Sequence, residues 1–281
     1  MNSIQSWMTK PAGQVSGIFR MRKPVVSDTK AGQPYLRIWL EDVSGSLCAY
    51  AWRKEIYENL NFQDLSCVYV EGQIRQRSDA TLVDLLAINT NQLQKRAGAV
   101  RLIPQSLCPV PWLMSVLDAA VSRLTSEPLA QFVESVLADD SIAFPFVSAP
   151  ASLNHHHNYP GGLLAHSLEC YQMVGKHSEF RRQSLELGLV AALFYDIGKI
   201  LTITHEMKRT SLGYNLDHDK LTLEILGPYL RQLDQQWPDG ANELRYLLTW
   251  KKGQKVPKHD MADLVSCCDR LSAGMGLQKR T

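Results

Sequence analysis

Residues 154–169 read NHHHNYPGGLLAHSLE, and the interpretation of the chain's second half starts from them. Three consecutive histidines precede a Pro-Gly-Gly turn, after which His166 lies in a run whose apolar residues recur with helical spacing. A helix that starts after this turn presents free backbone N–H groups, which attract anions. The stretch therefore gathers several imidazoles around one helix start.

Carboxylates and a lysine follow in later helical runs. Residues 193–199, Leu-Phe-Tyr-Asp-Ile-Gly-Lys, carry Asp196 and Lys199, and Asp269 lies in a further run. Imidazoles and carboxylates from separate helices suit a divalent cation, and Mn, Mg and Fe all fit this ligand set. We predict five metal ligands and two catalytic residues for a phosphodiester substrate: His166, Asp196, Asp269, His218 and His156 as ligands, and Asp196 and Lys199 in catalysis. The triple histidine equally suits an exposed loop, and His218 suits a surface helix start.

Composition sets few limits on function. The chain of 281 residues is long enough for two domains, and its formal charge of +2 gives no global argument for nucleic acid. It contains six cysteines, no Cys-x-x-Cys pair and no apolar run of membrane-spanning length. We therefore expect a cytoplasmic protein with reduced thiols and no membrane partner, and a homo-oligomer stays open.

Residues 1–94 are predicted to form strands. Short runs rich in Val, Ile and aromatic residues are separated by turn residues such as Ala31-Gly32 and Ser78-Asp79. The expected strands are 14–26, 35–41, 47–52, 67–76 and 81–88, with a helical segment at 53–60. Five strands with a helix between the third and fourth are typical of an OB-fold barrel. Residues 17–20, 36–42 and 70–74 also resemble the nucleic-acid-binding OB family.

One face of this barrel is predicted to bind a single strand. Alternation along the second strand places Leu36, Ile38 and Leu40 on one face and Arg37 and Trp39 on the other. Aromatic side chains stack bases, and cations contact phosphates. The predicted nucleic-acid contacts, including a basic loop in the second half, are Arg20, Arg22, Lys23, Arg37, Trp39, Trp52, Lys251 and Lys252. The alternative places both tryptophans in the barrel core.

The remainder is predicted to be a linker and a helical domain. Residues 95–111 contain three prolines and an Arg-Ala-Gly sequence, which indicate a linker. From 112 to 281 the apolar spacing becomes helical. Helices are expected at about 162–177, 183–195, 217–235, 241–250 and 260–274, and residues 144–151 as an irregular approach. The fold class is therefore α+β multidomain, with an OB-fold barrel followed by an all-α domain.

The helical half resembles the HD-domain metal phosphohydrolases. This resemblance depends on His166, Asp196 with Gly198-Lys199, His218 and Asp269. An OB barrel ahead of such a domain is similar to the YhaM-type 3′–5′ exoribonucleases. Residues 150–169 look more like the HD domain of MobH-class conjugative relaxases. These resemblances imply a metal-dependent phosphodiesterase or nuclease that acts on single-stranded RNA or DNA.

Two positions depart from the family pattern. Tyr195 stands where the family has the histidine of its His-Asp pair, and a phenol with an ordinary pKa near 10 is a poor ligand at neutral pH. Trp250 lies in Leu-Thr-Trp-Lys-Lys-Gly, where YhaM-type enzymes have His-His-Gly. Two interpretations therefore stay open. The domain is either an active metal-dependent phosphodiesterase, or a degenerate domain that serves as a nucleic-acid-binding or assembly module in DNA transfer or mobile-element function. Nucleotide phosphohydrolysis, as in other HD proteins, is a third possibility that the barrel disfavours, since monomers need no strand-binding face.

Overall fold

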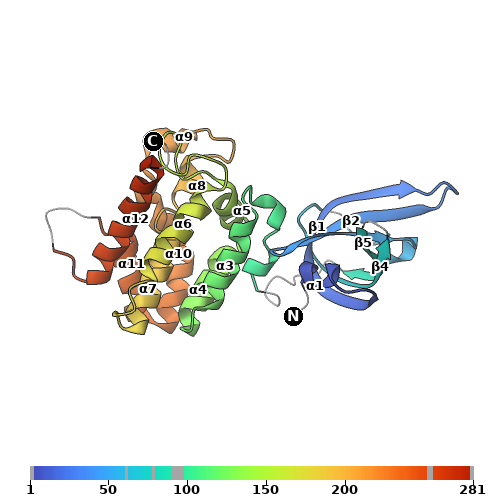
Figure 1. The fold of residues 1–281 in the computed structure, drawn as a ribbon, viewed down its shortest axis with the longest axis horizontal. Coiled ribbons are helices and arrows are strands. Elements are labelled where there is room, and N and C mark those ends of the chain that lie inside the picture. Colours follow the sequence, from blue (N-terminus) through green and yellow to red (C-terminus); the bar gives the residue numbers. More distant parts are fainter. Residues whose placement is uncertain (1–2, 61–62, 78–79, 90–97, 252–255, 279–281) are drawn as a thin grey trace. The chain divides into compact units, whose positions relative to one another are not determined.

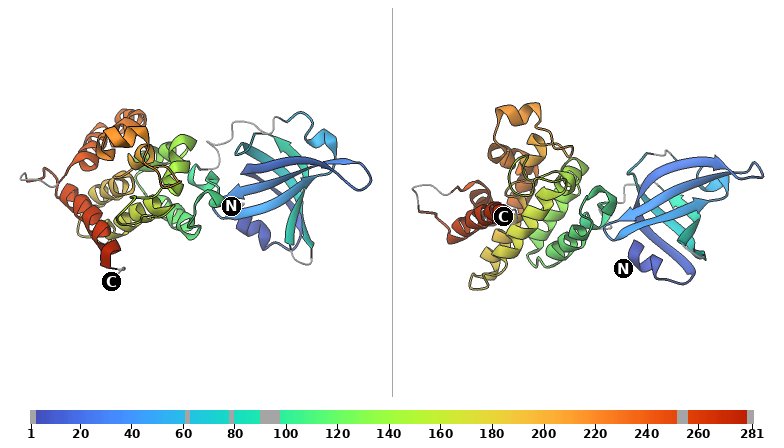
Figure 2. Two further views of the ribbon diagram at one scale, coloured as in Figure 1. Left: turned by 90° about the horizontal axis from the view of Figure 1, so that it is seen from above. Right: turned by 45° about the horizontal axis from the view of Figure 1, so that its top comes forward.

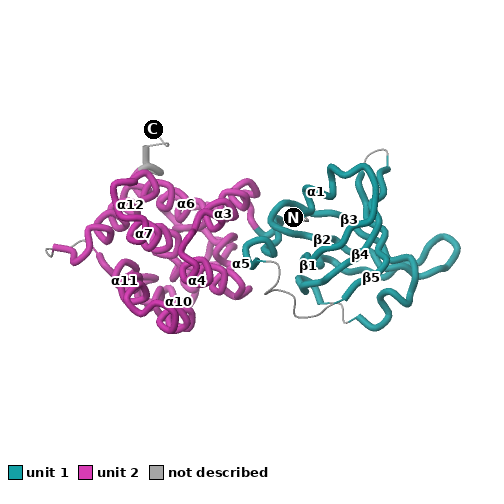
Figure 3. The backbone as a smooth tube through the Cα atoms, turned by 90° about the horizontal axis from the view of Figure 1, so that it is seen from below, with its two compact units in different colours: residues 1–107 teal, residues 108–281 magenta. Residues whose placement is uncertain are grey.

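The computed structural model describes residues 3–60, 63–77, 80–89, 98–251 and 256–278, without the side chains of 275–278. Two compact units, Met1–Leu107 and Cys108–Thr281, make up the chain (Figure 3). The first is a β-barrel and the second is helical (Figure 1). The predicted fold class, a five-stranded barrel followed by an all-helical region, is confirmed.

The first unit is a barrel of strands (Figure 2). Five strands close it in the order β1-β2-β3-β5-β4. Their bounds are β1 Gly13–Asp28, β2 Pro34–Asp42, β3 Gly45–Ala51, β4 Cys67–Arg77 and β5 Ala80–Asn89. The pairs are antiparallel except for β3 with β5, which run parallel. Closure pairs every strand on both sides, which removes exposed sheet edges. This is the architecture of an OB-fold barrel.

Alternation along β2 decides which side chains fill the barrel. Leu36, Ile38 and Leu40 are fully buried, whereas Trp39 is 38% exposed. The predicted division of this strand into an inner and an outer face is therefore confirmed. A short helix that the sequence did not predict, α1 (Ile4–Met8), packs Trp7 edge-on against the core residue Phe19, with 4.6 Å between ring centroids.

Two expectations for the first unit need correction. The segment predicted as a helix at 53–60 contains only one 3-10 turn, η1 (Lys54–Ile56). The linker predicted at 95–111 is wrong from residue 99 to 107, because those residues pack on the barrel. They form η2 (Val100–Leu102) and η3 (Gln105–Leu107), the Val43 N–H donates to the carbonyl of Arg101, and Ile103 is buried. Residues 95–97 lie outside the described part of the chain.

The second unit is built from helices. Their bounds are α3 Trp112–Ser122, α4 Glu127–Leu137, α5 Asp140–Ser148, α6 Gly162–Val174, α7 Arg182–Phe194, α8 Lys199–Thr202, α9 Ser211–Asn215, α10 His218–Gln236, α11 Pro238–Thr249 and α12 Asp260–Gln278. The five helices predicted after residue 160 correspond to α6, α7, α10, α11 and α12. Phe194, at the end of α7, packs against Phe132 and Phe146, with ring centroids 6.1 and 5.9 Å apart.

The irregular approach predicted at 144–151 is wrong over its first half, because α5 runs through Pro145. A proline inside a helix removes one backbone hydrogen bond. Here the Asp139 carboxylate caps the helix by accepting from the Ser141 N–H at 2.9 Å, and Phe146 and Val147 are fully buried. Burial of this apolar face outweighs the lost hydrogen bond, which the proline alone did not reveal. No helix in the described ranges combines the length and apolar composition needed to cross a bilayer.

Candidate metal centre and nucleic-acid face

His166 lies inside α6, one turn from the start that the Pro-Gly-Gly sequence creates. Gly161 adopts a left-handed conformation (φ 81°) as the N-cap, a conformation that glycine tolerates best. At Gly162 an added Cβ would lie 2.0 Å from the carbonyl oxygen of His157. Gly162 therefore lets the triple-histidine loop approach the first turn of α6, and His166 is only 2% exposed.

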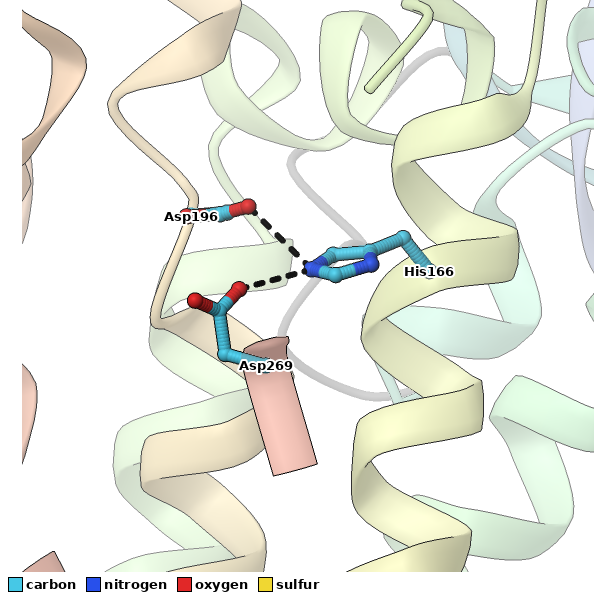
Figure 4. Close-up of side chains that lie close together, drawn as sticks. All are labelled: His166, Asp196 and Asp269. Atoms are coloured by element: carbon cyan, nitrogen blue, oxygen red, sulfur yellow. Dashed lines mark hydrogen bonds and ion pairs between the residues drawn. The ribbon is translucent and has the colours of Figure 1, made fainter. Parts of the chain in front are cut away.

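The structure brings three predicted ligands together. The His166 Nε2 atom lies 3.2 Å from Oδ2 of Asp196 and 3.1 Å from Oδ1 of Asp269 (Figure 4). Asp196 lies in the turn between α7 and α8, and Asp269 lies on α12. The three ligand atoms are within 4.8 Å of one another, close enough to share one cation. We name this set the His166 trio.

Asp196 also belongs to a second group of ligand atoms. Its Oδ1 atom lies 3.2 Å from Nε2 of His218, which is 3.0 Å from Oδ1 of Asp219. We name Asp196, His218 and Asp219 the His218 trio. At Gly198 an added Cβ would lie 2.0 Å from the carbonyl oxygen of His218, so a glycine there permits the close approach of α10. On the other side, the Lys199 Nζ atom lies 2.5 Å from Asp196 Oδ2.

A chain of hydrogen bonds fixes the orientation of His166. Ser272 Oγ donates to Oε2 of Glu169 at 2.6 Å, so it accepts from Nδ1 of His166 at 2.9 Å. Glu169 also lies 3.0 Å from Nε2 of His157. With Nδ1 protonated, the neutral imidazole directs its Nε2 lone pair at the two carboxylates. This is the tautomer that a metal ligand requires.

Burial disfavours the charged forms of His166 and Asp196, but hydrogen bonds and nearby charges favour these forms more strongly. Burial lowers the pKa of His166, but hydrogen bonds to Asp196 and Asp269 raise it well above its ordinary value. Burial raises the pKa of Asp196, but Lys199 and the imidazoles of His166 and His218 hold it well below its ordinary value. A proton on His166 Nε2 thus lies where a cation would bind, so the two compete for the site.

The environment of His156 shows whether the donor set at this centre suits a divalent cation. Its Nε2 atom is buried and has no hydrogen-bond partner among the described residues, and its ring lies 5.0 Å from that of His166. Burial, followed by the positive charges of His166 and Lys199, lowers the pKa of His156 to about 4. A neutral imidazole with a buried, unused nitrogen is what an additional metal ligand requires. The donor set therefore fits one divalent cation.

Tyr195 does not enter the His166 trio. Its hydroxyl donates a 2.7 Å hydrogen bond to the carbonyl oxygen of Trp250, and burial raises its pKa further above the range of a ligand. The ammonium of Lys251 lies 4.1 Å from the centre of the Tyr195 ring and 3.0 Å from Oδ1 of Asp219. Lys251 is exposed and stays a predicted strand contact, with its ammonium paired to Asp219 in this structure. Lys252 lies outside the described residues.

Two of the arginines predicted to contact a strand are structural. Arg20 is 4% exposed, and its Nε and Nη1 atoms donate to the carbonyl oxygens of Leu102 (3.1 Å) and Leu65 (2.9 Å). Arg22 forms ion pairs with Glu41 at 3.7 Å and Asp64 at 3.4 Å. These guanidinium groups satisfy internal acceptors, so neither remains a predicted strand contact. Lys23 and Arg37 are exposed and stay predictions.

The barrel carries an aromatic face made of the half-buried Tyr35 and Tyr50 and the exposed Trp52. The rings of Tyr50 and Trp52 are stacked, 5.1 Å apart at an angle of 7°, and Tyr35 lies 5.2 Å from Trp52. Trp52 is 44% exposed and its Nε1 donates to Asp84 at 2.8 Å. Trp39 borders a separate hollow of about 520 Å³ on the same unit. Both tryptophans are exposed, so the alternative that placed them in the core is wrong.

Sequence reasoning missed Ser272, Glu169 and the pairing of Asp219. Glu169 follows His166 by three positions, and Ser272 follows Asp269 by three. Residues three apart share a helix face, so each lies beside a predicted ligand. That spacing was the signal available, and it would have indicated a second layer of hydrogen bonds around the trio.

Comparison with known proteins gives distant relatives. No family model matches the chain. It is 22% identical over 213 residues to a 3′–5′ exoribonuclease YhaM of Listeria welshimeri, covering 70% of this chain and 63% of the relative. Against YhaM of Bacillus subtilis the identity is 21%, covering 89% of this chain and 81% of the relative. The chain resembles the YhaM exoribonucleases.

Solved structures of single-stranded-DNA-binding proteins also resemble part of the chain. The mitochondrial protein Rim1 of S. cerevisiae matches 29% of this chain and 97% of its own, at 13% identity and a TM-score of 0.25. A small single-stranded-DNA-binding protein of Streptomyces coelicolor matches 30% of this chain and 96% of its own, at 17% identity and a TM-score of 0.25. At these TM-scores the OB-fold assignment depends on the barrel's own strand order.

Proposed function

We propose that this chain binds single-stranded nucleic acid on its barrel and hydrolyses phosphodiester bonds with a divalent cation held by its helical unit. The observation that carries the proposal is the convergence of His166, Asp196 and Asp269 within 4.8 Å. Sequence similarity to proteins named 3′–5′ exoribonucleases supports it, although the first of these is matched over only 63% of its length.

The cation would be held by His166, Asp196 and Asp269, with His156 as the additional imidazole. When bound, such a cation lowers the pKa of a coordinated water and polarises a phosphoryl oxygen. Ser272 holds His166 in the ligand tautomer through the 2.9 Å hydrogen bond at Nδ1. Because this hydroxyl is itself fixed by Glu169, the imidazole is oriented before a cation arrives.

Two further side chains have roles in the proposed reaction. Lys199, with its Nζ atom 2.5 Å from Asp196, would supply a fixed positive charge to a phosphate bound at this centre. Burial lowers the pKa of His218, but hydrogen bonds to Asp196 and Asp219 raise it to about 9. His218, whose Nε2 lies 3.2 Å from Asp196, is the proposed general acid for the leaving oxygen.

The aromatic face is the proposed strand-binding surface. Stacking of a base on an exposed aromatic ring contributes about 1–3 kcal/mol and does not depend strongly on sequence. Trp52 offers such a ring, the half-buried Tyr50 stacks against it, and Arg37 lies on the neighbouring strand, opposite Tyr50. Strands 2 and 3 of OB folds commonly provide this surface. The names of the relatives make RNA the first substrate to test, with removal of nucleotides from the 3′ end.

A second candidate is a binding or assembly module without turnover. It is favoured by the charges of Lys199 and protonated His166, which balance the carboxylates of Asp196 and Asp269 without any cation. Such a protein would bind strands on the aromatic face and cleave none.

One assay separates the two candidates. Single-stranded RNA and DNA carrying a 5′ label are incubated with the purified, untagged chain and Mn²⁺, Mg²⁺ or Fe²⁺, and the product lengths are resolved with time. We expect stepwise shortening from the 3′ end that His166→Ala and Asp269→Asn abolish. His177→Ala is the matched control, since it removes an exposed imidazole that pairs with Glu179 at 2.8 Å. Strand binding without shortening under all three cations refutes the hydrolase and supports the module.

A further inference from the structure

The two trios share Asp196, and this arrangement suggests a pair of cations at first sight. Oδ2 of Asp196 faces the His166 trio and Oδ1 faces His218. Each trio has its ligand atoms within 4.8 Å. Many nucleases and phosphatases hold two cations about 3.5–4 Å apart. The number of cations at this centre therefore depends on what else lies beside the His218 trio.

A lysine ammonium already lies beside it. Nζ of Lys251 is 3.0 Å from Oδ1 of Asp219, the same oxygen that lies 3.0 Å from Nε2 of His218. A divalent cation coordinated by that oxygen would lie close to the ammonium, where two positive charges repel strongly in a partly buried site. The carboxylate of Asp219 cannot serve both at full strength. Lys199 pairs with Asp196 in the same way, so both carboxylates of the His218 trio carry an ammonium. In the His166 trio only Asp196 does, because the ion pair of Asp269 within the described residues is with His166.

Tyr195 holds this ammonium in place. The phenol hydroxyl is anchored to the carbonyl of Trp250, the residue immediately before Lys251, and the Lys251 ammonium lies 4.1 Å above the phenol ring. An aromatic face within about 6 Å attracts a cation. One side chain thus fixes the backbone ahead of the lysine and also attracts its charge. Tyr195 therefore acts through its hydroxyl and the face of its ring, and this role does not require it to be a metal ligand.

We infer that this chain binds a single divalent cation, at the His166 trio, and that the ammonium of Lys251 takes the place of a second cation at the His218 trio. The inference rests on the proposed metal-dependent function. It makes Lys251 the residue that determines the number of cations. The positive charge of Lys251 belongs to the chain, so it stays at the centre when chelators remove the divalent ion.

The test is the number of Mn²⁺ ions bound per chain, measured by equilibrium dialysis with elemental analysis and by electron paramagnetic resonance. We expect one ion per wild-type chain and an uncoupled signal. Lys251→Met, which removes the charge and keeps the stem, is expected to bind two ions with a spin-coupled signal. Lys251→Arg keeps a cation and is expected to bind one. The double variant Lys251→Met with Asp219→Asn is expected to return to one, because it removes a ligand of the second ion.

A control variant and the number of bound ions separate failure of the one-cation inference from failure of the metal-dependent function. Lys208→Met removes another lysine paired with a carboxylate, Glu206 at 3.3 Å, and is expected to bind one ion. Two ions on the wild-type chain, or one ion on a folded Lys251→Met variant, overturn the inference and leave the metal centre intact. No ion on the wild-type chain overturns the metal-dependent function, and the inference falls with it. Circular dichroism confirms folding of each variant.

Discussion

Replacement of Ser272 by alanine tests whether the proposed metal centre depends on its surrounding hydrogen bonds. The hydroxyl is fully buried, accepts from Nδ1 of His166 at 2.9 Å and donates to Glu169 at 2.6 Å. Without it, His166 loses the partner that selects its tautomer. Loss of such a partner typically weakens metal affinity about 10–100-fold, which corresponds to roughly 1.4–2.7 kcal/mol. The change leaves every ligand in place, so an effect must come through orientation.

Ser167 provides a matched control. It is also a buried serine, at 1% exposure, and it adjoins His166 in the sequence. Its Oγ has no hydrogen-bond partner among the described residues. Ser167→Ala therefore removes the same atom from a similar environment without disturbing the tautomer, and Mn²⁺ affinity is expected to stay unchanged.

The assay is the Mn²⁺ dissociation constant of the two alanine variants and the wild type, with urea unfolding of the metal-free proteins beside it. For Ser272→Ala we also expect a loss of about 1–3 kcal/mol in the free energy of unfolding, because the buried Nδ1 proton is left unpaired. The reasoning is refuted if Ser272→Ala binds Mn²⁺ as tightly as the wild type. Equal weakening by both variants would refute it too, because the loss would then reflect packing alone.

Three further predictions concern charge, stacking and buried arginine. The fold raises the pKa of His218 to about 9, so its contribution to the stability of the metal-free protein is full below about pH 6.5 and is lost as pH rises through 9. Urea unfolding should therefore give a lower free energy of unfolding at pH 9.5 than at pH 6. The decrease between these two pH values should be smaller for His218→Asn. Trp52→Ala should weaken single-strand binding by about 1–3 kcal/mol in fluorescence anisotropy, whereas Trp112→Ala, which removes a 65% exposed ring on α3, should not. Arg20→Ala should lower unfolding free energy by about 1–3 kcal/mol, because it leaves two carbonyls without their donor, and should leave strand affinity unchanged in the same anisotropy assay.

Local patterns in the sequence predicted the elements well wherever one face of an element is buried. The alternation of Leu36, Ile38 and Leu40 located β2 because a period of two is forced on a strand with one face in a core. Likewise His166, Asp196 and Asp269 could be selected because each lies in an apolar helical run, where an ionisable group needs a partner. The structure places all three together.

Long-range pairing is what the sequence could not show. Arg20 is a basic residue on a strand, which suits a nucleic-acid contact, but its hydrogen bonds to the carbonyls of Leu65 and Leu102, 45 and 82 residues later, make it structural. Pro145 predicted a break, and only the burial of Phe146 in the helical core explains why α5 continues. In both cases the deciding partner comes from a distant segment, so local propensity gave the wrong answer.

The role of each positive side chain in this protein depends on the acceptor with which the fold pairs it. Arg20, Arg22 and Lys251 were selected by charge alone, and each is paired within the fold, with carbonyls or carboxylates. Strand binding in the proposed function must therefore rely more on exposed aromatic rings than on a dense row of cations. The formal charge of +2 gives no global argument for a basic binding groove. In the helical unit, the Lys251 ammonium beside Asp219 reduces the number of divalent cations that the proposed centre binds. The number of lysines and arginines in the sequence thus indicates neither the strand affinity nor the metal content, and both follow from which acceptors the fold brings to each charge.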